Sequence, residues 1–127
     1  MKPGVTIWRD ENGTPHIEAA KTTDLYWGMG YVHATDRGLQ MLLMRILGQG
    51  RASEMLDASE KTLNIDKFFR KVNWSGNIQH HLEQLSEQDR AALMAYSDGA
   101  NAVFSKKCPS PKEHSRPARA GTSPCPE

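Results

Sequence analysis

Hydrophobic and polar residues follow two different spacings along this 127-residue chain, and the change falls near residue 20. The first stretch, "VTIWRDENGTPHIEA" at residues 5–19, has two short β-prone runs on either side of a turn. Asn12 and Gly13 both tolerate positive φ, so this stretch predicts a β-hairpin. Pro15 limits strand pairing, which places a sheet edge or a bulge at that position.

From residue 22 the apolar spacing becomes that of helices. Thr22 or Thr23 is available as the N-cap of the first helix. Gly48 and Gly50 are expected to end it before a short second helix begins. Further amphipathic patterns follow at residues 62–74 and 78–85, and Ser86 is expected to cap the last helix, at residues 87–104. The sequence predicts an α+β chain with an N-terminal β-hairpin followed by four or five helices.

The stretch at residues 30–47 is too apolar for a surface helix, yet it carries four polar side chains on one stripe: His33, Asp36, Arg37 and Gln40. A helix that is apolar on most other sides is expected to be covered on most sides. A buried charge without a partner is costly, so the charged residues must pair. We interpret the four residues as a structural polar network, in which Asp36 pairs with Arg37, or Arg37 reaches Gln40 and the hairpin.

Charge divides the chain into two unlike segments. Residues 1–104 contain 11 basic and 13 acidic residues, a net charge of −2, whereas residues 105–127 contain 5 basic and 2 acidic residues, a net charge of +3. The second segment has five of the seven prolines and no large apolar residue, so we expect a disordered tail, with unpaired thiols at Cys108 and Cys125. Its composition resembles a GC-rich gene read out of frame, which favours a frameshift over an evolved tail.

The sequence offers weak candidates for catalysis or metal binding. His33 and Asp36 have a helical spacing that suits two metal ligands, but no third ligand is evident. A Ser53, His33 and Asp36 triad has no support from sequence spacing. Hydrogen bonding within the fold is the favoured role for these side chains, and a structural role is favoured for His16. The adjacent His80 and His81 point in different directions on a helix and are interpreted as a solvated pair. We therefore predict no catalytic residue and no metal ligand, and the substrate-binding residues stay unknown.

Nucleic acid and membrane partners are both disfavoured. The basic residues of the tail have no aromatic residues between them, and the chain contains no apolar run long enough for a membrane span. The N-terminus lacks a basic region followed by an apolar run, so the chain as it stands is expected to be cytoplasmic.

Four stretches, in order, resemble the N-terminal part of the α subunit of the penicillin amidase (penicillin acylase) family. They span residues 5–104: "VTIWRDENGTPHIEA", "DLYWGMGYVHATDRGLQMLLMRILGQGRASEML", "NIDKFFR" and "AYSDGANAVF". The resemblance implies an N-terminal nucleophile hydrolase, whose fold is a four-layer αββα sandwich made from a self-cleaving precursor. Within the match, Gly13, Pro15 and His16 fit the hairpin pattern, and Gly30, His33, Asp36, Arg37, Gln40 and Met41 fit the helix pattern.

The resemblance also implies what lies outside this chain. In the family the nucleophile is the first residue of the β subunit, so the expected partners are the remainder of the α subunit and the β subunit. No cofactor is expected, although calcium is possible in the full-length family with ligands outside this chain. The leading hypothesis is an inactive α-subunit fragment of an amide hydrolase acting on a β-lactam side chain or an acyl-homoserine lactone. The alternative is a non-enzymatic helical binding protein on the same scaffold. Family members are commonly periplasmic or secreted, which leaves the compartment open.

Overall fold

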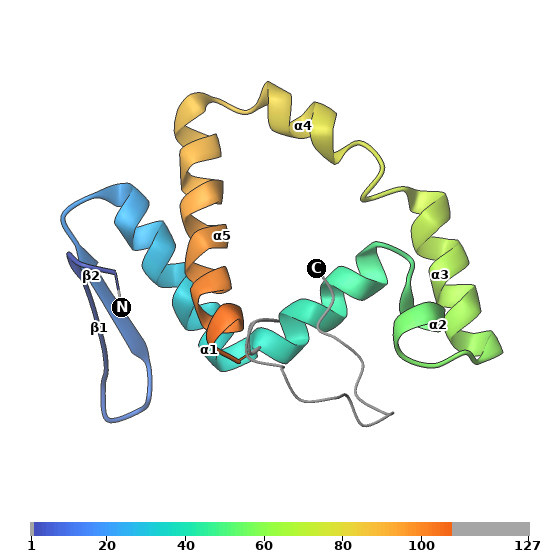
Figure 1. Cartoon of the computed structure of the whole chain (residues 1–127), viewed down its shortest axis with the longest axis horizontal. Helices are drawn as coiled ribbons and strands as arrows, with labels where there is room; N and C mark the ends of the chain where they lie inside the picture. The colour runs from blue at the N-terminus through green and yellow to red at the C-terminus, as the bar shows by residue number, and fades with distance from the viewer. Residues whose placement is uncertain (1, 108–127) are drawn as a thin grey trace, which may run out of the picture.

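The computed structural model describes residues 2–107 and consists of a β-hairpin followed by five helices (Figure 1). The elements are β1 (Val5–Arg9), β2 (Pro15–Ala19), α1 (Thr22–Gly48), α2 (Ala52–Met55), α3 (Glu60–Val72), α4 (Ile78–Gln84) and α5 (Glu87–Lys107). The predicted α+β fold class is confirmed. Residues 105–107, expected in the tail, are helical, and Lys106 lies over the Tyr31 ring. The rest of the expected disordered tail, with Cys108 and Cys125, lies outside the described residues.

The hairpin forms through a longer loop than the Asn-Gly dipeptide predicts. β1 pairs antiparallel with β2 from Val5↔Ala19 to Arg9↔Pro15, without a bulge. The five residues between the strands are organised by Asp10, whose Oδ1 accepts hydrogen bonds from the amides of Asn12 (3.0 Å) and Thr14 (2.8 Å). Gly13 takes a positive φ of 79°, and Asn12 does not. The side chain of Asp10 therefore selects the turn.

The hairpin and α5 both pack on the first half of α1, at positions where α1 has no side chain. A Cβ at Gly28 would lie 2.5 Å from Ile17 Cγ2 of the hairpin, and a Cβ at Gly30 would overlap the carbonyl oxygen of Tyr96 in α5. On the other side of the crossing, a Cβ at Gly99 would overlap the carbonyl oxygen of Trp27. Gly28 thus admits a side chain of the hairpin, and Gly30 admits the backbone of α5.

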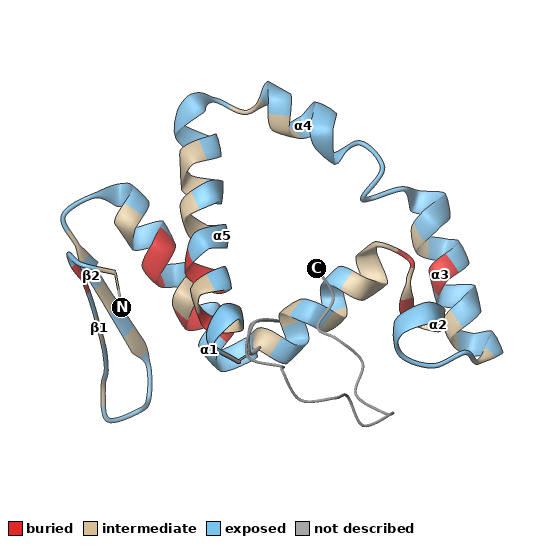
Figure 2. Ribbon diagram, in the orientation of Figure 1, coloured by how far each residue is buried: buried red, intermediate tan, exposed pale blue. Residues whose placement is uncertain are grey.

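A small hydrophobic core fills the crossing between α1 and α5. Ala34, Ala100 and Val103 are buried there, and Tyr31, Met41 and Phe104 pack against them. Most of the buried residues lie along these two helices, and the other red segments in Figure 2 lie on the hairpin and around α2 and α3. The pair of helices thus forms the centre to which the hairpin attaches.

The helix ends agree with the sequence patterns except at the start of α1. Its N-cap is Lys21, which makes no side-chain cap, so the assignment to Thr22 or Thr23 was wrong. Gly50, with a φ of 63°, separates α1 from α2 as expected. Ser86 Oγ accepts from the amide of Asp89 (3.1 Å), which confirms the predicted cap of α5.

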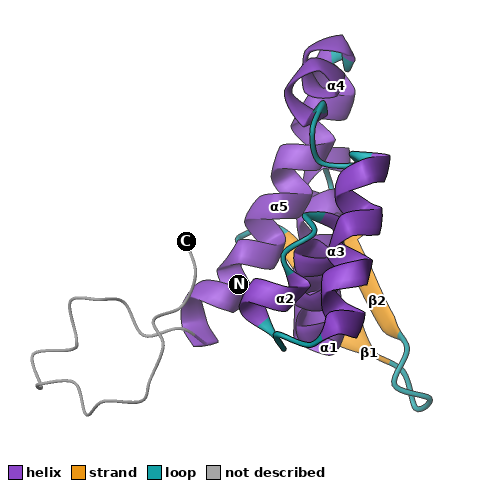
Figure 3. Ribbon diagram, turned by 90° about the vertical axis from the view of Figure 1, so that its right-hand side faces the viewer, coloured by secondary structure: helices purple, strands orange, loops and turns teal. Residues whose placement is uncertain are grey.

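Beyond the α1–α5 crossing, much apolar surface is exposed. α4 extends past the other helices at one end of the molecule (Figure 3), and none of its residues is buried. Exposed large apolar residues on the second half of α1, on α3 to α4 and on α5 include Leu39, Leu42, Met44, Phe68, Trp74, Ile78, Leu93 and Met94. We expected α1 to be covered on most sides, but within residues 2–107 it is not. No helix there is long and apolar enough to cross a membrane.

Adding a methyl group at the crossing is expected to separate α1 from α5. Gly30→Ala and Gly99→Ala should each lower the free energy of unfolding by about 1–3 kcal/mol, because overpacking against a backbone cannot relax by a side-chain rotation. Urea denaturation followed by circular dichroism measures the change. Gly48→Ala is the control, since a Cβ there meets no atom within 4 Å. Equal effects at Gly30 and Gly48 would contradict the close approach.

Candidate functional site

The polar stripe of α1 lies at a bend in the helix. Arg37 has non-helical backbone angles, with φ −130° and ψ 24°, so α1 is two helical segments joined at this residue. Two local features favour a bend: Thr35 Oγ1 donates a hydrogen bond to the Tyr31 carbonyl (2.8 Å), and Gly38 follows Arg37. The bend turns the second half of α1 away from α5 (Figure 1).

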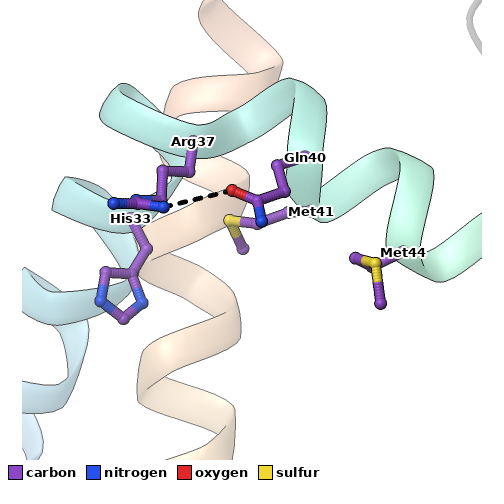
Figure 4. Close-up of a pocket in the computed structure, with 5 residues that line it drawn as sticks. All are labelled: His33, Arg37, Gln40, Met41 and Met44. Carbon is purple, nitrogen blue, oxygen red and sulfur yellow. Dashed lines mark hydrogen bonds between the residues drawn. The ribbon is translucent and has the colours of Figure 1, made fainter.

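An open pocket of about 280 Å³ lies along the bend, lined by His33, Arg37, Gln40, Met41 and Met44 (Figure 4). Arg37 Nη1 donates to Gln40 Oε1 at 3.4 Å, which is the one hydrogen bond between the side chains of these five described residues. The two methionines supply an apolar wall next to the guanidinium and amide groups. Because no hydroxyl, thiol or amine side chain lines the pocket, this wall beside polar groups suits contact with another surface better than covalent catalysis.

The other two members of the polar stripe bind different elements. His33 Nδ1 lies 3.0 Å from the Tyr96 hydroxyl of α5, in hydrogen-bond contact. Asp36 Oδ1 accepts from Arg9 Nη2 of β1 at 2.5 Å, and Arg9 Nη1 donates to the Gly13 carbonyl at 2.7 Å. Asp36 therefore pairs with the hairpin and not with Arg37.

These contacts divide the expected network into three parts. One part joins α1 to α5, one joins α1 to β1, and the third stays within α1. All four side chains are exposed in residues 2–107, and the Arg9 and Asp36 side chains are 41% and 36% exposed. A buried network of the four residues remains a prediction for an assembly in which another chain covers α1.

A second polar centre, which the sequence patterns did not identify, is built around Asp66 of α3. Asp66 is 3% exposed, and its carboxylate accepts hydrogen bonds from the Ala52 amide (2.7 Å), the Ser53 amide (2.8 Å) and Ser53 Oγ (2.5 Å). It caps the first turn of α2 from another helix. Asp66 lies in the family-like stretch "NIDKFFR", but its spacing on α3 could not reveal that its partner is α2.

Opposing effects set the pKa of Asp66. Burial raises the pKa of this carboxyl. Hydrogen bonds from Ser53 and Ala52 and the charge of Arg70 lower the pKa by more than burial raises it, so it lies below its ordinary value. One turn later on α3, Arg70 Nε donates to the Gly50 carbonyl at 2.9 Å. Gly50 has a positive φ, and a Cβ there would lie 2.6 Å from Arg70 Cγ. Asp66 and Arg70 together hold the connection between α1 and α2.

Within residues 2–107, the candidate catalytic and metal-binding residues do not come together. Ser53 binds Asp66, His33 binds Tyr96 and Asp36 binds Arg9, so the three members of the conceivable triad have three different partners. His16 contacts Asp10 and stacks on Trp8, and His80 contacts Gln84. In this part of the chain no group of three or more His, Cys, Asp or Glu side chains could hold a metal ion. The donors present do not fit calcium.

Comparison with known proteins decides the family. A family model described as penicillin amidase matches residues 4–119, which extends past Ser105 into the segment where we expected no resemblance. Penicillin G acylase of Escherichia coli is 39% identical over 102 residues. This chain belongs to the penicillin amidase family.

Other relatives agree with this assignment. An acyl-homoserine lactone acylase, QuiP, of Pseudomonas syringae pv. syringae is 39% identical over 104 residues. A solved structure of thermostable penicillin G acylase from Alcaligenes faecalis has a TM-score of 0.72 and 31% identity, and the match covers 87% of this chain and 60% of that chain. The hairpin and helices described above are therefore the arrangement found in a penicillin amidase-family structure.

The chain spans a small part of its curated relatives. The matches cover 80% and 82% of this chain but 12% of the E. coli and P. syringae sequences. The match to the solved A. faecalis chain has a similar length but covers 60% of that chain, against 12% of the E. coli sequence. The A. faecalis chain is therefore about one-fifth as long as the E. coli sequence. The chain is thus a segment of the family's full length.

Replacing the Asp66 carboxylate should destabilise the α1–α3 region in a pH-dependent way. Asp66→Asn should lower the melting midpoint at pH 7 by several degrees, because one amide oxygen cannot replace a carboxylate that accepts three hydrogen bonds. A lowered folded-state pKa contributes stability above the unfolded value of 3.8. That contribution is lost as the pH falls through the folded-state pKa, so the difference between wild type and variant should shrink below about pH 4.

Thermal melts by circular dichroism at several pH values measure this effect. Asp57→Asn, in the exposed loop before α3, is the matched control and should leave the midpoint unchanged. A pH-independent difference at Asp66 would show that the carboxylate charge does not stabilise the cap.

Proposed function

We propose that this chain is the N-terminal α-subunit segment of a penicillin amidase-type hydrolase that cleaves an amide bond. The observation that carries the proposal is the family match, which covers most of this chain but 12% of the E. coli relative. The proposed partners are the remainder of the α subunit and the β subunit. In this proposal the chain supplies scaffold, and the reacting groups come from its partners.

The chemistry of amide hydrolysis supports a scaffold role. A serine nucleophile needs an adjacent base, and the tetrahedral intermediate needs preorganised donors for its oxyanion. Among residues 2–107, Ser53 Oγ donates to the carboxylate of Asp66, which caps α2, and Ser86 Oγ, which caps α5, donates to the carboxylate of Asp89. These serines stabilise helices. We infer that the isolated segment is inactive.

The names of the relatives indicate the class of substrate. One relative is named for penicillin G and another for acyl-homoserine lactones. Penicillin G and these lactones share an acyl group joined to nitrogen through an amide bond. We therefore propose that the complete enzyme releases an acyl group from a small-molecule amide. Its acyl preference depends on partners outside this chain.

The contacts at the bend of α1 support the scaffold proposal in detail. The Arg9–Asp36 pair fixes the hairpin to α1, and the His33–Tyr96 contact fixes α5 to the same stretch. The pocket beside them is open and largely apolar, with Met41 and Met44 in its wall. In the proposed enzyme this stripe faces another part of the protein, which would bury the four polar residues and complete their network.

Activity should depend on the missing chain. The purified 127-residue chain should hydrolyse neither penicillin G nor acyl-homoserine lactones, because it lacks the nucleophile and the oxyanion site. A chimera of E. coli penicillin G acylase, in which this chain replaces the matched 102-residue stretch, should mature and hydrolyse penicillin G. Release of the free amine measures both.

Two outcomes would contradict the proposal. Turnover by the isolated chain, lost on mutation of one of its serines, would place the catalytic group here. A chimera that never matures, together with an isolated chain that is a compact monomer, would instead support the non-enzymatic binding protein. A chimera carrying Asp36→Ala tests the scaffold contact separately, and its maturation should be impaired.

A further inference from the structure

Three aromatic rings lie at and just after the C-terminal end of α3, where Phe69 contacts both Phe68 and Trp74, and the two outer rings are largely exposed in the described chain. The Phe68 and Phe69 ring centroids are 5.4 Å apart, and so are the Phe69 and Trp74 centroids. Phe68 is 60% exposed and Trp74 is 65% exposed. We call Phe68, Phe69 and Trp74 the aromatic cluster. Its exposure is unusual because aromatic side chains gain much from burial.

The backbone after α3 holds Trp74 in this cluster. Asn73 adopts the left-handed conformation, with φ 59° and ψ 39°, and its amide donates to the Phe69 carbonyl at 2.9 Å. Asparagine tolerates this conformation better than most residues, so it ends α3 and turns the following ring back onto Phe69. The amide of Gly76 then donates to the Asn73 carbonyl at 3.2 Å. The cluster is therefore formed before any partner binds, which reduces the entropy lost on binding.

The segment that carries the cluster is basic. Residues 67–74, "KFFRKVNW", contain Lys67, Arg70 and Lys71 and no acidic residue. The preceding acidic residue, Asp66, is buried and bound to Ala52 and Ser53. A surface with an apolar centre and a positive rim is complementary to an apolar pocket with a negative rim.

We propose that the aromatic cluster anchors this chain in an apolar pocket, rimmed by Asp or Glu side chains, on the remainder of the penicillin amidase-family protein. The inference rests on the proposed function, since the match covers 12% of the E. coli relative and leaves most of that protein's length to supply the pocket. Interfaces typically obtain most of their binding energy from a few central aromatic residues such as tryptophan. Trp74 is the residue of the cluster with the largest side chain and the greatest exposure.

An anionic lipid surface also attracts basic and aromatic residues. The ring geometry favours a protein partner, because the two ring pairs have interplanar angles of 81° and 58°. Rings at such angles form a ridge, and a shaped pocket fits a ridge better than a flat bilayer does. Lipid binding is kept as an outcome of the test.

The test measures binding of the full 127-residue chain to an E. coli penicillin G acylase polypeptide that lacks the matched stretch. Wild type is expected to bind, and Trp74→Ala should raise the dissociation constant by about 30-fold, a size typical of an aromatic hot spot. Trp8→Ala is the matched control, because Trp8 is also an exposed tryptophan, stacked on His16 of the hairpin. Its dissociation constant should change by less than about threefold, as for a residue outside a hot spot.

A second pair of variants tests the rim without disturbing the rings. Lys67→Glu combined with Lys71→Glu should slow association at low salt, and the effect should shrink at high salt. Lys61→Glu, near the start of the same helix, is the control and should have a smaller effect. This arm remains informative if Trp74→Ala lowers the helix content of the chain.

Each outcome has a distinct meaning. If wild type does not bind the polypeptide, the proposed function and the anchor both fail. If wild type binds and Trp74→Ala binds equally well, or Trp8→Ala loses as much, the anchor alone is refuted. Cosedimentation of the chain with phosphatidylserine-containing vesicles, lost in Trp74→Ala, would assign the cluster to a lipid surface and overturn the proposal.

Discussion

The direct contact between the backbones of α1 and α5 determines how the rest of the described chain is arranged. Gly30 and Gly99 allow it, because a Cβ at either position would overlap a carbonyl oxygen of the other helix. The small core of Ala34, Ala100 and Val103 lies beside this crossing. Small residues are needed where the two backbones meet, since a larger side chain at those positions would push α1 and α5 apart. The hairpin then attaches to α1 at Gly28, so the close approach positions both ends of the described chain.

The bend at Arg37 separates this packed half from a more open half. On one side, Asp36 is bound to Arg9 of the hairpin and His33 to Tyr96 of α5. On the other side, the second half of α1 leads to α2 and α3. Asp66 and Arg70 of α3 hold the connection between α1 and α2. Each half thus has its own polar contacts, and the apolar side chains between them remain uncovered. This division fits the proposed role as a segment of a larger fold, in which neighbouring parts of the protein would complete the core.

Residue patterns over a few positions predicted the local features of the fold. They could not predict contacts between residues that are distant in sequence. The hairpin, the break at Gly48 and Gly50 and the cap at Ser86 each depend on residues a few positions apart. The spacing of the polar stripe placed four residues on one side of a helix, but the bend at Arg37 and the partners Arg9 and Tyr96 depend on tertiary packing. Asp66 was missed for the same reason, since its partners lie on α2. The start of α1 was misassigned because threonine is a favourable N-cap residue, whereas the N-cap position is occupied by Lys21.

We propose that this chain buries its apolar surfaces only against the rest of a penicillin amidase-family protein. Leu39, Phe68 and Trp74 are 74%, 60% and 65% exposed in the described chain, and a protein with such uncovered surface tends to self-associate or to bind a hydrophobic dye. The most direct measurement is light scattering with size-exclusion chromatography on the isolated chain, together with dye-binding fluorescence. We expect self-associated species, or a monomer that binds dye strongly. A monodisperse 14.2 kDa monomer that binds no dye would contradict the proposal.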